Sequence, residues 1–343
     1  MKIAIDAMGG DFAPSAIIQG VKLGYQDYPD VDMVLVGPRD ILEKELHSVG
    51  LSPDDARLEI VEATQVVEMD EPSAVALRQK KNSSITVSAN LLKDGIVEGI
   101  VSAGHTGAAV ASTVVKCRML PGIDRPGIAA VFPAPPGRFV LLDVGANVDC
   151  KPRHLAQYAI LGERYADLVL GIRQPRVGIL SVGEEDGKGN DLTKQAHKMM
   201  KELPINFIGN VEGHEMFANE VDVVVCDGFV GNAVLKCCES LAKAMFGLLK
   251  SNLMKTPMRK AGAFLSKNAF LELKELTDHE EYGGAPLLGI NGNCIIAHGS
   301  SSPKSIRNAI RVCREMVSQR LNERILSKIQ DVDWQAIEPK EDV

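Results

Sequence analysis

The clearest chemical feature of this sequence is a glycine-rich turn that joins an apolar strand to a helix. Residues 223–226 (Val-Val-Val-Cys) are typical of a buried strand, and Asp-Gly-Phe-Val-Gly-Asn over 227–232 interrupts it. The apolar spacing from 233 to 249 is helical, which places Lys236 one turn inside the helix. A helix that begins directly after a strand presents free N–H groups and the positive end of its dipole to an anion. We therefore predict an anion-binding site at this turn.

Four other loops repeat this order of strand, glycine turn and helix: 102–107, 143–147, 183–190 and 298–301. Ligands of parallel sheets bind at the carboxyl ends of the strands, so we expect all five loops to line one cleft at one edge of the sheet. The residues of these loops predicted to bind phosphate or substrate are Gly104, His105, Thr106, Gly107, Asn147, Gly228, Gly231, Lys236, His298 and Ser300.

Each of these residues also has a plainer interpretation. Asp227 is a favourable N-cap residue for the helix after it, and Lys236 could lie on the surface of that helix. Asn147 and Asn232 each end a glycine turn, where asparagine is tolerated in left-handed backbone. His105 could donate to a phosphate, or it could be a solvated loop histidine.

The loop over 183–190 is close to a Walker A motif but departs from it. Only three residues separate Gly183 from Gly187-Lys188, and Gly189 replaces the Ser or Thr that would hold magnesium. This departure excludes nucleotide hydrolysis. Lys188 is then either a mobile cation that reaches an anion or an exposed loop lysine.

Apolar strands alternate with helices along almost the whole chain. The strands are continuously apolar, which is typical of a mostly parallel sheet covered by helices on both faces. We predict an α/β/α sandwich that forms a single domain over 1–330, with a loose tail over 331–343. The expected strands are 2–5, 31–36, 58–61, 99–102, 128–132, 139–142, 177–182, 205–208, 223–226 and 294–297.

The composition narrows the class of protein. The net charge of −7 argues against a general nucleic-acid binder. The first six residues become acidic without a signal-peptide core, and no apolar run reaches the roughly 18–20 residues of a membrane span. The seven cysteines show no metal-binding spacing, so reduced core thiols are the simplest interpretation. We expect a cytoplasmic protein that binds no metal.

One segment, 250–267, has an unusual composition for an acidic protein. It carries five basic residues and no acidic one, interleaved with apolar side chains. We predict a helical protrusion over about 246–276, broken near Thr256-Pro257, that lies on an anionic membrane surface. Docking of an acidic protein and a plain surface hairpin are the alternatives. The predicted contact residues are Leu253, Met254, Met258, Arg259, Lys260 and Phe264.

Seven motifs distributed over nearly the whole chain carry a resemblance to a known family. They are Ile3-Ala-Ile-Asp-Ala-Met-Gly-Gly-Asp11, Ser102-Ala-Gly-His-Thr-Gly-Ala108, Leu142-Asp-Val-Gly-Ala-Asn-Val-Asp-Cys-Lys-Pro152, Gly209-Asn-Val-Glu-Gly213, Cys226-Asp-Gly-Phe-Val-Gly-Asn232, Tyr282-Gly-Gly-Ala-Pro-Leu-Leu-Gly289 and Ala297-His-Gly-Ser-Ser301. In these motifs the sequence resembles the PlsX family of acyl-carrier-protein:phosphate acyltransferases. It departs from the family at His105, where asparagine is usual, and at His214, where arginine is common.

The resemblance implies a homodimer with a Rossmann-like fold similar to phosphotransacetylases and isopropylmalate dehydrogenases. It implies the reaction of acyl-ACP with inorganic phosphate to give acyl phosphate, which a membrane glycerol-3-phosphate acyltransferase then consumes in phospholipid synthesis. No cofactor is implied. The matched positions that look functional in the family are Lys188, Asp227 and Asn232, together with the turns of His105 and Asn147.

This chemistry fits the residues present. Inorganic phosphate is already an anionic nucleophile, so no activated serine or cysteine is required, and the thiolate leaving group is readily protonated. The remaining task is to hold phosphate and stabilise the tetrahedral oxyanion. We hypothesise that Lys188 and Asn232 orient phosphate or the oxyanion, and that Asp227 positions Lys188 or handles the thiol proton. Transfer from acyl-CoA and a non-catalytic acyl- or phosphate-binding scaffold remain alternatives.

Overall fold

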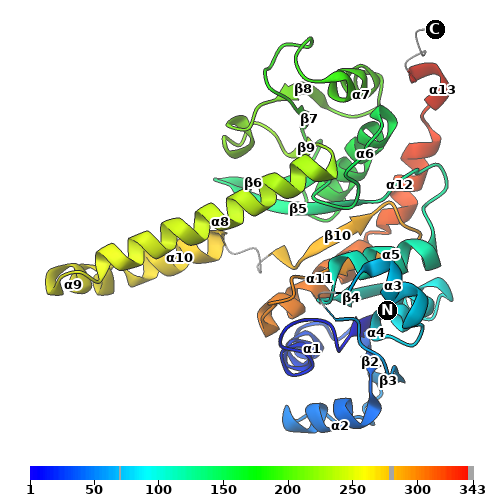
Figure 1. The fold of residues 1–343 in the computed structure, drawn as a ribbon, viewed down its shortest axis with the longest axis vertical. Helices are drawn as coiled ribbons and strands as arrows, with labels where there is room; N and C mark the ends of the chain where they lie inside the picture. Colours follow the sequence, from blue (N-terminus) through cyan, green and yellow to red (C-terminus); the bar gives the residue numbers. More distant parts are fainter. Residues whose placement is uncertain (69–70, 278–281, 339–343) are drawn as a thin grey trace.

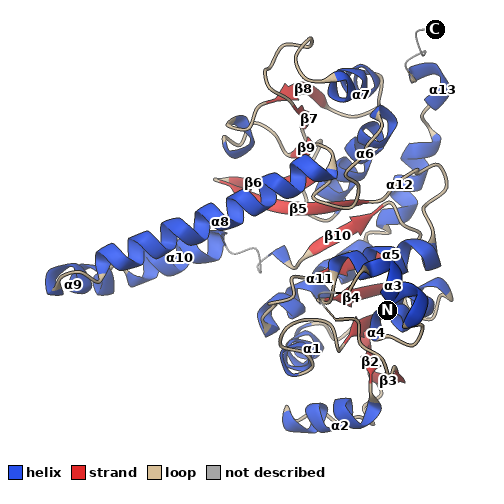
Figure 2. Ribbon diagram, in the orientation of Figure 1, coloured by secondary structure: helices blue, strands red, loops and turns tan. Residues whose placement is uncertain are grey.

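The computed structural model describes residues 1–68, 71–277 and 282–338. Its centre is one eleven-stranded sheet in the order β3-β2-β1-β4-β11-β10-β5-β6-β9-β7-β8 (Figures 1 and 2). The strands are β1 Lys2–Asp6, β2 Asp32–Gly37, β3 Leu58–Glu62, β4 Gly99–Ser102, β5 Gly127–Ala134, β6 Gly137–Leu142, β7 Val177–Leu180, β8 Phe207–Val211, β9 Val223–Val225, β10 Ala285–Leu288 and β11 Asn293–Ile296.

Helices cover both faces of this sheet, as the continuously apolar strands predicted. They are α1 Ser15–Asp27, α2 Arg39–Ser48, α3 Ser73–Gln79, α4 Ser84–Lys93, α5 Thr106–Cys117, α6 Pro152–Leu168, α7 Asp191–Lys201, α8 Gly228–Leu253, α9 Pro257–Leu265, α10 Lys267–Thr277, α11 Pro303–Ser318, α12 Leu321–Gln330 and α13 Trp334–Ile337, with a short 3-10 helix at Glu215–Phe217. The predicted fold class, a mostly parallel α/β/α sandwich, is confirmed.

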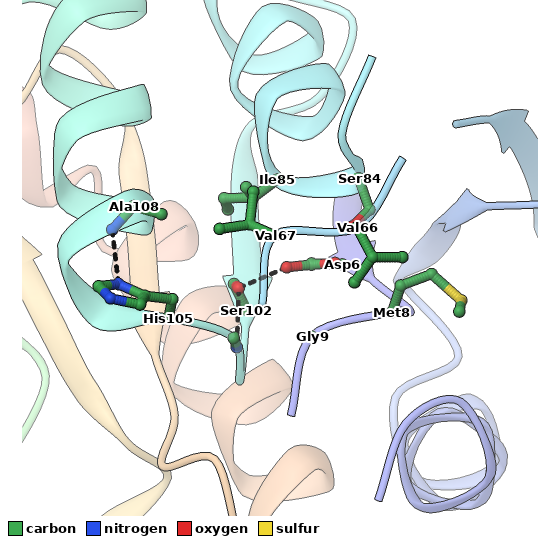
Figure 3. Close-up of a pocket in the computed structure, with 11 residues that line it drawn as sticks. Asp6, Met8, Gly9, Val66, Val67, Ser84, Ile85, Ser102, His105 and Ala108 are labelled. Atoms are coloured by element: carbon green, nitrogen blue, oxygen red, sulfur yellow. Dashed lines mark hydrogen bonds between the residues drawn. The ribbon is translucent and has the colours of Figure 1, made fainter. Parts of the chain in front are cut away.

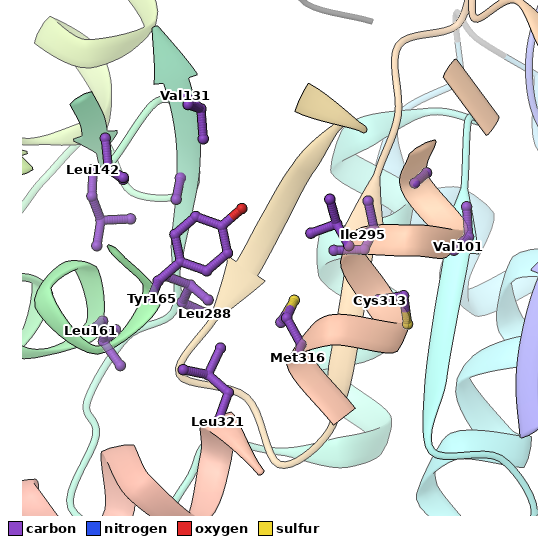
Figure 4. Close-up of a cluster of buried hydrophobic side chains, with 14 of the residues drawn as sticks. Val101, Val131, Leu142, Leu161, Tyr165, Leu288, Ile295, Cys313, Met316 and Leu321 are labelled. Atoms are coloured by element: carbon purple, nitrogen blue, oxygen red, sulfur yellow. The ribbon is translucent and has the colours of Figure 1, made fainter. Parts of the chain in front are cut away.

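Two apolar cores hold the layers together. One core joins the sheet to α1, α6, α11 and α12, and the other joins the opposite face to α4, α5 and the first turns of α8. Figure 4 shows the first core continuing from Tyr165 of α6, past Leu288 of β10, to Val101 of β4. Because the same core crosses the central strands, the two halves of the sheet are packed as one body.

The strand directions divide the sheet into two parallel halves. Strands β3, β2, β1, β4 and β11 are mutually parallel, and β6, β9, β7 and β8 form a second parallel set. Between them, β10 and β5 pair only antiparallel. Three antiparallel pairings in succession reverse the direction, so the second half points opposite to the first.

The prediction that all five loops lie at one edge of the sheet is therefore wrong. Loops 102–107 and 298–301 leave the carboxyl ends of β4 and β11, whereas 143–147, 183–190 and 227–232 leave those of β6, β7 and β9. The two groups nevertheless meet at the same level. Across the paired strands, Ser102 and Leu141 lie in the same row of the sheet, with β11, β10 and β5 between them. Ser102 is the last residue of β4, and Leu141 is the last but one of β6.

Some elements were missed or misjudged from the sequence. The four-residue strand β10 contains Pro286 and follows two glycines, and α2 has few apolar residues, so neither was predicted. The tail was expected to be loose from 331, but α13 lies within it and the indole of Trp334 is buried against the core. Residues 339–343 of that tail lie outside the described residues.

Helix α8 extends beyond the sheet and carries α9 and α10 at its far end (Figure 1). The break falls at Thr256-Pro257, as predicted, because Thr256 caps α9 and Pro257 occupies its first turn. No residue of α9 is buried, and the side chain of Met258 is 86% exposed.

Candidate active site

The turn at 227–232 is a capped helix start. The Asp227 carboxylate accepts hydrogen bonds from the backbone N–H groups of Phe229 and Val230, both at 2.9 Å, so α8 begins at Gly228 rather than at residue 233. Asn232 consequently lies in the helix. The interpretation that it ends the turn in left-handed backbone is therefore wrong. The plainer interpretation of Asp227 is thus confirmed, because Asp227 is the N-cap residue of α8 and its Oδ1 atom accepts the capping hydrogen bonds.

The two glycines of this turn are required by close packing against the loop after β6. A Cβ atom on Gly228 would lie 2.6 Å from the Asn147 carbonyl oxygen, and one on Gly231 would lie 1.9 Å from the Asp143 carbonyl oxygen. The Gly228 N–H donates to that same Asn147 oxygen at 2.8 Å. The loop after β6 therefore seats the N-terminus of α8.

Asp143 organises the loop after β6. Its fully buried carboxylate accepts backbone N–H groups from four residues: Ile128 and Gly145 at 3.0 Å, Ala146 at 2.9 Å and Asn147 at 2.7 Å. Burial raises the pKa of Asp143, and the four N–H donors oppose that rise. The carboxylate is thus a fixed part of the turn.

Asn147 also serves the fold. Its amide donates to the Pro126 carbonyl and, at 2.8 Å, to the Tyr158 hydroxyl, and its backbone is not left-handed. The predicted substrate contact of Asn147 is therefore not supported by its side-chain partners. The Asn232 side chain is exposed and lies over Gly145, which makes it the amide of this group that can reach a ligand.

Exposed apolar side chains surround this helix start. Val148 follows β6, Val182 follows β7, and Phe229 lies in the first turn of α8 with 69% of its side chain exposed. The three strands β6, β9 and β7 are neighbours, so these side chains share one end of the sheet. None of these three side chains was predicted, although an apolar residue within or next to a glycine turn was the available signal.

Lys188 lies exposed in a loop that is anchored at several points. Asp186 pairs with Lys201 and lies 3.5 Å from the ring Nε2 of the buried His197. The Asn210 amide donates to the Glu185 carbonyl oxygen at 2.7 Å and contacts His197 Nδ1 at 2.9 Å. Of the residues that the structure describes, none forms an ion pair with Lys188. The ammonium group is thus held on a fixed loop while remaining available to a ligand.

Lys236 lies farther along α8 than predicted. It is the ninth residue of the helix and pairs with Glu239 at 3.0 Å. Eight residues of helix place it about 12 Å from the N-terminus. The prediction of Lys236 one turn inside the helix is wrong because α8 begins five residues earlier than the apolar spacing indicated.

His105 caps α5 on the other half of the sheet. Its ring Nδ1 accepts a hydrogen bond from the Ala108 N–H at 3.1 Å (Figure 3). A neutral imidazole that accepts at Nδ1 carries its proton on Nε2. Asparagine, the residue that the resemblance led us to expect here, is among the best N-cap residues, and His105 makes a capping contact of the same kind.

The loop 298–301 lies beside the loop that follows the first strand. The Ser300 N–H and hydroxyl both contact His298 Nδ1, at 3.2 Å and 2.8 Å, and the Gly299 carbonyl oxygen accepts the Asp11 N–H at 2.7 Å. A Cβ on Gly9 would lie 2.7 Å from the backbone nitrogen of Gly104. The loops therefore form two groups. One group consists of 6–11, 102–107 and 298–301. The other consists of 143–147 and 227–232, and the Lys188 loop lies at the same end of the sheet as this second group.

Both groups offer a helix N-terminus over the same face of the sheet. Residues of α5 and of the first turns of α8 pack into the same apolar core, and the strand ends before them lie at the same level.

The cysteines nearby are not activated. Burial raises the pKa of the Cys226 thiol well above its ordinary value and that of Cys150 to about 11. Cys237 is exposed, against the expectation of core thiols. The arrangement can bind an anion without a covalent nucleophile.

Comparison with known proteins agrees with this chemistry. The family described as "Fatty acid synthesis protein" matches residues 1–324. The phosphate acyltransferase of Pelotomaculum thermopropionicum is 49% identical over 333 residues, covering 97% of this chain and 96% of the relative. That of Desulfitobacterium hafniense is 48% identical over 330 residues, covering 96% and 98%.

Among solved structures, a phosphotransacetylase from Streptococcus pyogenes matches with a TM-score of 0.65 at 16% identity, covering 93% of this chain and 94% of that one. At this identity the match concerns the fold. A branched-chain phosphotransacylase from Enterococcus faecalis gives a TM-score of 0.52 at 13% identity, covering 92% and 99%. With relatives at this level of identity over nearly their full length, the chain belongs to the phosphate acyltransferase family, the PlsX family that its motifs resemble.

Proposed function

We propose that the protein transfers an acyl group from acyl-ACP to inorganic phosphate, giving acyl phosphate and free ACP. The observation that carries this proposal is the pair of helix N-termini, α5 and α8, that open at one level over the same face of the sheet. One can hold the phosphate nucleophile and the other the developing oxyanion. Both species are anions, and both are stabilised by free N–H groups and helix dipoles.

The residues at the α8 end are assigned to the oxyanion. The Lys188 ammonium group and the Asn232 amide are exposed donors at this end of the sheet. Asp227 uses its Oδ1 atom to cap α8, and no ion pair with Lys188 exists within the described residues. Asp227 is therefore a positioning residue in this proposal, and the thiolate takes its proton from solvent. The α5 end, with Gly104, His105, Thr106 and Gly107, is assigned to phosphate.

The acyl donor needs apolar contacts for its chain. Val148, Val182 and Phe229 provide exposed apolar surface beside Lys188 and Asn232. This surface suits a long acyl chain on either carrier, and the family membership is what favours acyl-ACP as the donor. Acyl-CoA as the donor remains the second candidate, and the phosphotransacetylase-like fold is what favours it.

The long helix α8 suits a homodimer. Leu241, Met245 and Leu248 recur at helical spacing and are exposed in the single chain. Two copies that pack these stripes against each other would bury them in a helical bundle. The active site of each protomer would remain at the base of the protrusion.

The tip of the protrusion is proposed to touch the anionic inner face of the membrane. Met258, Phe264 and Leu265 are strongly exposed beside Arg259 and Lys260. No helix of the described residues has the length and apolar character of a membrane span. Such reversible contact of a cytoplasmic enzyme would release acyl phosphate, which hydrolyses readily, near a membrane glycerol-3-phosphate acyltransferase.

The deciding experiment measures acyl phosphate formed from acyl-ACP and phosphate by the purified full-length chain. Acyl phosphate is trapped with hydroxylamine and the freed ACP thiol is counted in the same sample. Equal amounts of both products support the proposal. Faster turnover with acyl-CoA than with acyl-ACP would assign the second candidate, and binding of either donor without product would indicate a scaffold.

A further inference from the structure

The motif Gly209-Asn-Val-Glu-Gly213 has no part in the chemistry described so far. Its asparagine, Asn210, belongs to the edge strand β8, and its side chain is only 7% exposed. A buried amide costs free energy unless both of its ends find hydrogen-bond partners. Both ends of the Asn210 amide have partners, and one of these belongs to the loop that carries Lys188.

A β-bulge in β8 directs Asn210 toward α7. Val177 of β7 pairs with Phe207, but the next residue of β7, Gly178, pairs with Gly209, so β8 contains one extra residue at this point. Phe207 and Asn210 are three positions apart and would lie on opposite faces of a regular strand, whereas the bulge places them on the same face. Gly209 permits the bulge, because its φ of 101° is unfavourable for residues with a Cβ atom.

His197 of α7 contacts both side chains on that face. Its buried ring packs edge-on against Phe207, with the ring centroids 5.1 Å apart, and its Nδ1 atom lies 2.9 Å from Asn210 Oδ1. The Nδ2 atom of Asn210 donates to the Glu185 carbonyl oxygen at 2.7 Å. A carbonyl oxygen can only accept, so Nδ2 faces Glu185 and Oδ1 faces His197. His197 Nδ1 therefore carries a hydrogen and donates it to Asn210.

The Glu185 carbonyl oxygen links this amide to Lys188. The same oxygen accepts the Lys188 N–H at 2.9 Å, which closes a turn over 185–188. The aliphatic part of the Lys188 side chain lies against Gly183, since a Cβ atom on that glycine would lie 2.9 Å from Lys188 Cγ. The direction of the lysine side chain therefore depends on the shape of this turn, and the Asn210 amide holds the turn to the sheet.

We propose that Asn210 is a positioning residue for Lys188. Its amide holds the Glu185 carbonyl, and that carbonyl holds the turn from which the lysine reaches the oxyanion. This inference rests on the proposed function, in which Lys188 stabilises the oxyanion, and it assigns the residue that sets where the ammonium group lies. A misplacement of about 1 Å can cost about 100-fold in rate, so a residue without substrate contact can still control turnover.

Asn210→Asp tests this role in the full-length chain with a side chain of nearly the same shape. Its second carboxylate oxygen would face the Glu185 carbonyl oxygen, and two acceptors repel each other, so the turn must move. We expect kcat for acyl phosphate formation to fall by about 10-fold to about 100-fold. KM for the acyl donor should stay within about threefold of wild type, because the oxyanion develops only in the transition state. An unchanged kcat, or a raised KM alone, would overturn the proposal.

Two further variants separate positioning from stability. Asp186→Asn removes the exposed ion pair of the same loop, and its kcat should stay within about threefold of wild type. His197→Phe keeps an aromatic ring beside Phe207 but deprives Asn210 Oδ1 of its donor, so it should unfold at a lower urea concentration. The hydrogen bond to Glu185 remains in this variant, so kcat should again stay within about threefold. A kcat that falls in step with stability across all three variants would give Asn210 a purely structural role.

A double-mutant cycle shows whether Asn210 acts through Lys188. In a Lys188→Ala chain, adding Asn210→Asp should change kcat by less than about threefold, because the group that Asn210 positions is already absent. Losses that multiply would overturn the proposal. Nitrogen NMR of the wild-type chain tests the contact even if Asn210→Asp does not fold. A His197 Nδ1 atom without a hydrogen would mean that the Asn210 amide is reversed, which also overturns the proposal.

Turnover distinguishes this inference from the proposed function. Acyl phosphate formation by wild type, with an unchanged kcat in Asn210→Asp, would keep the function and overturn the inference. If the wild type forms no acyl phosphate, the proposed function fails, and crystal structures of wild type and Asn210→Asp test the link by themselves. A displaced 185–188 turn in the variant would support the link between Asn210 and Lys188, and an unmoved turn would overturn it.

Discussion

The Asn147 carbonyl oxygen accepts the Gly228 N–H at 2.8 Å, which ties the loop after β6 to the first residue of α8. Asp143 holds that loop through four backbone N–H groups, and Gly231 lies against the Asp143 carbonyl. The position of the α8 N-terminus therefore depends on a contact between two loops that are far apart in sequence.

Gly231→Ala tests this seating. The new Cβ would lie 1.9 Å from the Asp143 carbonyl oxygen, so α8 must shift, and we expect a loss of about 1–3 kcal/mol in the free energy of unfolding. Urea denaturation measures it. Gly247→Ala is the matched control, since it lies in the same helix with no neighbour within 4 Å, and it should stabilise by about 0.5–1 kcal/mol. Equal effects at both glycines would refute the seating.

Lys188→Ala tests the assignment of the oxyanion donor. We expect kcat to fall by roughly two to three orders of magnitude, the scale for one transition-state donor, with an unchanged melting temperature. Lys198→Ala, on the exposed face of α7, is the control and should retain activity. A loss of activity that tracks a loss of fold would give Lys188 a structural role.

The exposed stripe of α8 makes a prediction about assembly. Leu241→Glu with Met245→Glu places charges where two copies would pack, so light scattering after size exclusion should report a monomer. Lys243→Glu lies on the same helix between them and should leave a dimer. A wild-type chain that is already monomeric would remove this face as the interface.

Membrane contact is tested at the tip. Met258→Glu with Arg259→Glu and Lys260→Glu should abolish sedimentation with anionic liposomes, because apolar insertion and about 1 kcal/mol per cation at low salt are both lost. In a soluble assay, KM for acyl-ACP should not change. Unaltered liposome binding with a raised KM would instead make the tip a dock for the acidic carrier protein.

Asp6 gives a pH dependence of known sign. Its pKa in the folded chain is raised above the ordinary 3.8, chiefly by desolvation. The contribution of Asp6 to the free energy of unfolding is therefore fully present below pH 3.8 and is lost as the pH rises through the raised pKa. Asp6→Asn cannot ionise, so its unfolding free energy relative to wild type should increase with pH. Asp30→Asn should show the opposite trend, since a hydrogen bond from Arg314 lowers the pKa of Asp30. Matching trends at both positions would contradict these assignments.

Short-range sequence signals were enough to predict the local units. Val223 to Val225 are a buried strand, Asp227 caps a helix, and Pro257 starts a new one, because these outcomes depend on side-chain type and short-range backbone geometry. The motif resemblance also identified the family from sequence. Exact helix starts were less predictable, as the shift of Lys236 by more than a turn shows.

The way these units face one another depends on long-range strand pairing. The antiparallel pairing of β10 with β11 and with β5 reverses one half of the sheet. Because β10 has only four residues and contains Pro286, its local sequence is too weak a signal to predict this pairing. Likewise, nothing in the residues around Asp6 indicates that its carboxyl group is buried against the Ser102 hydroxyl. The Ser102 hydroxyl reaches it from 96 positions away, and such a contact exists only after long-range strand pairing brings β1 beside β4.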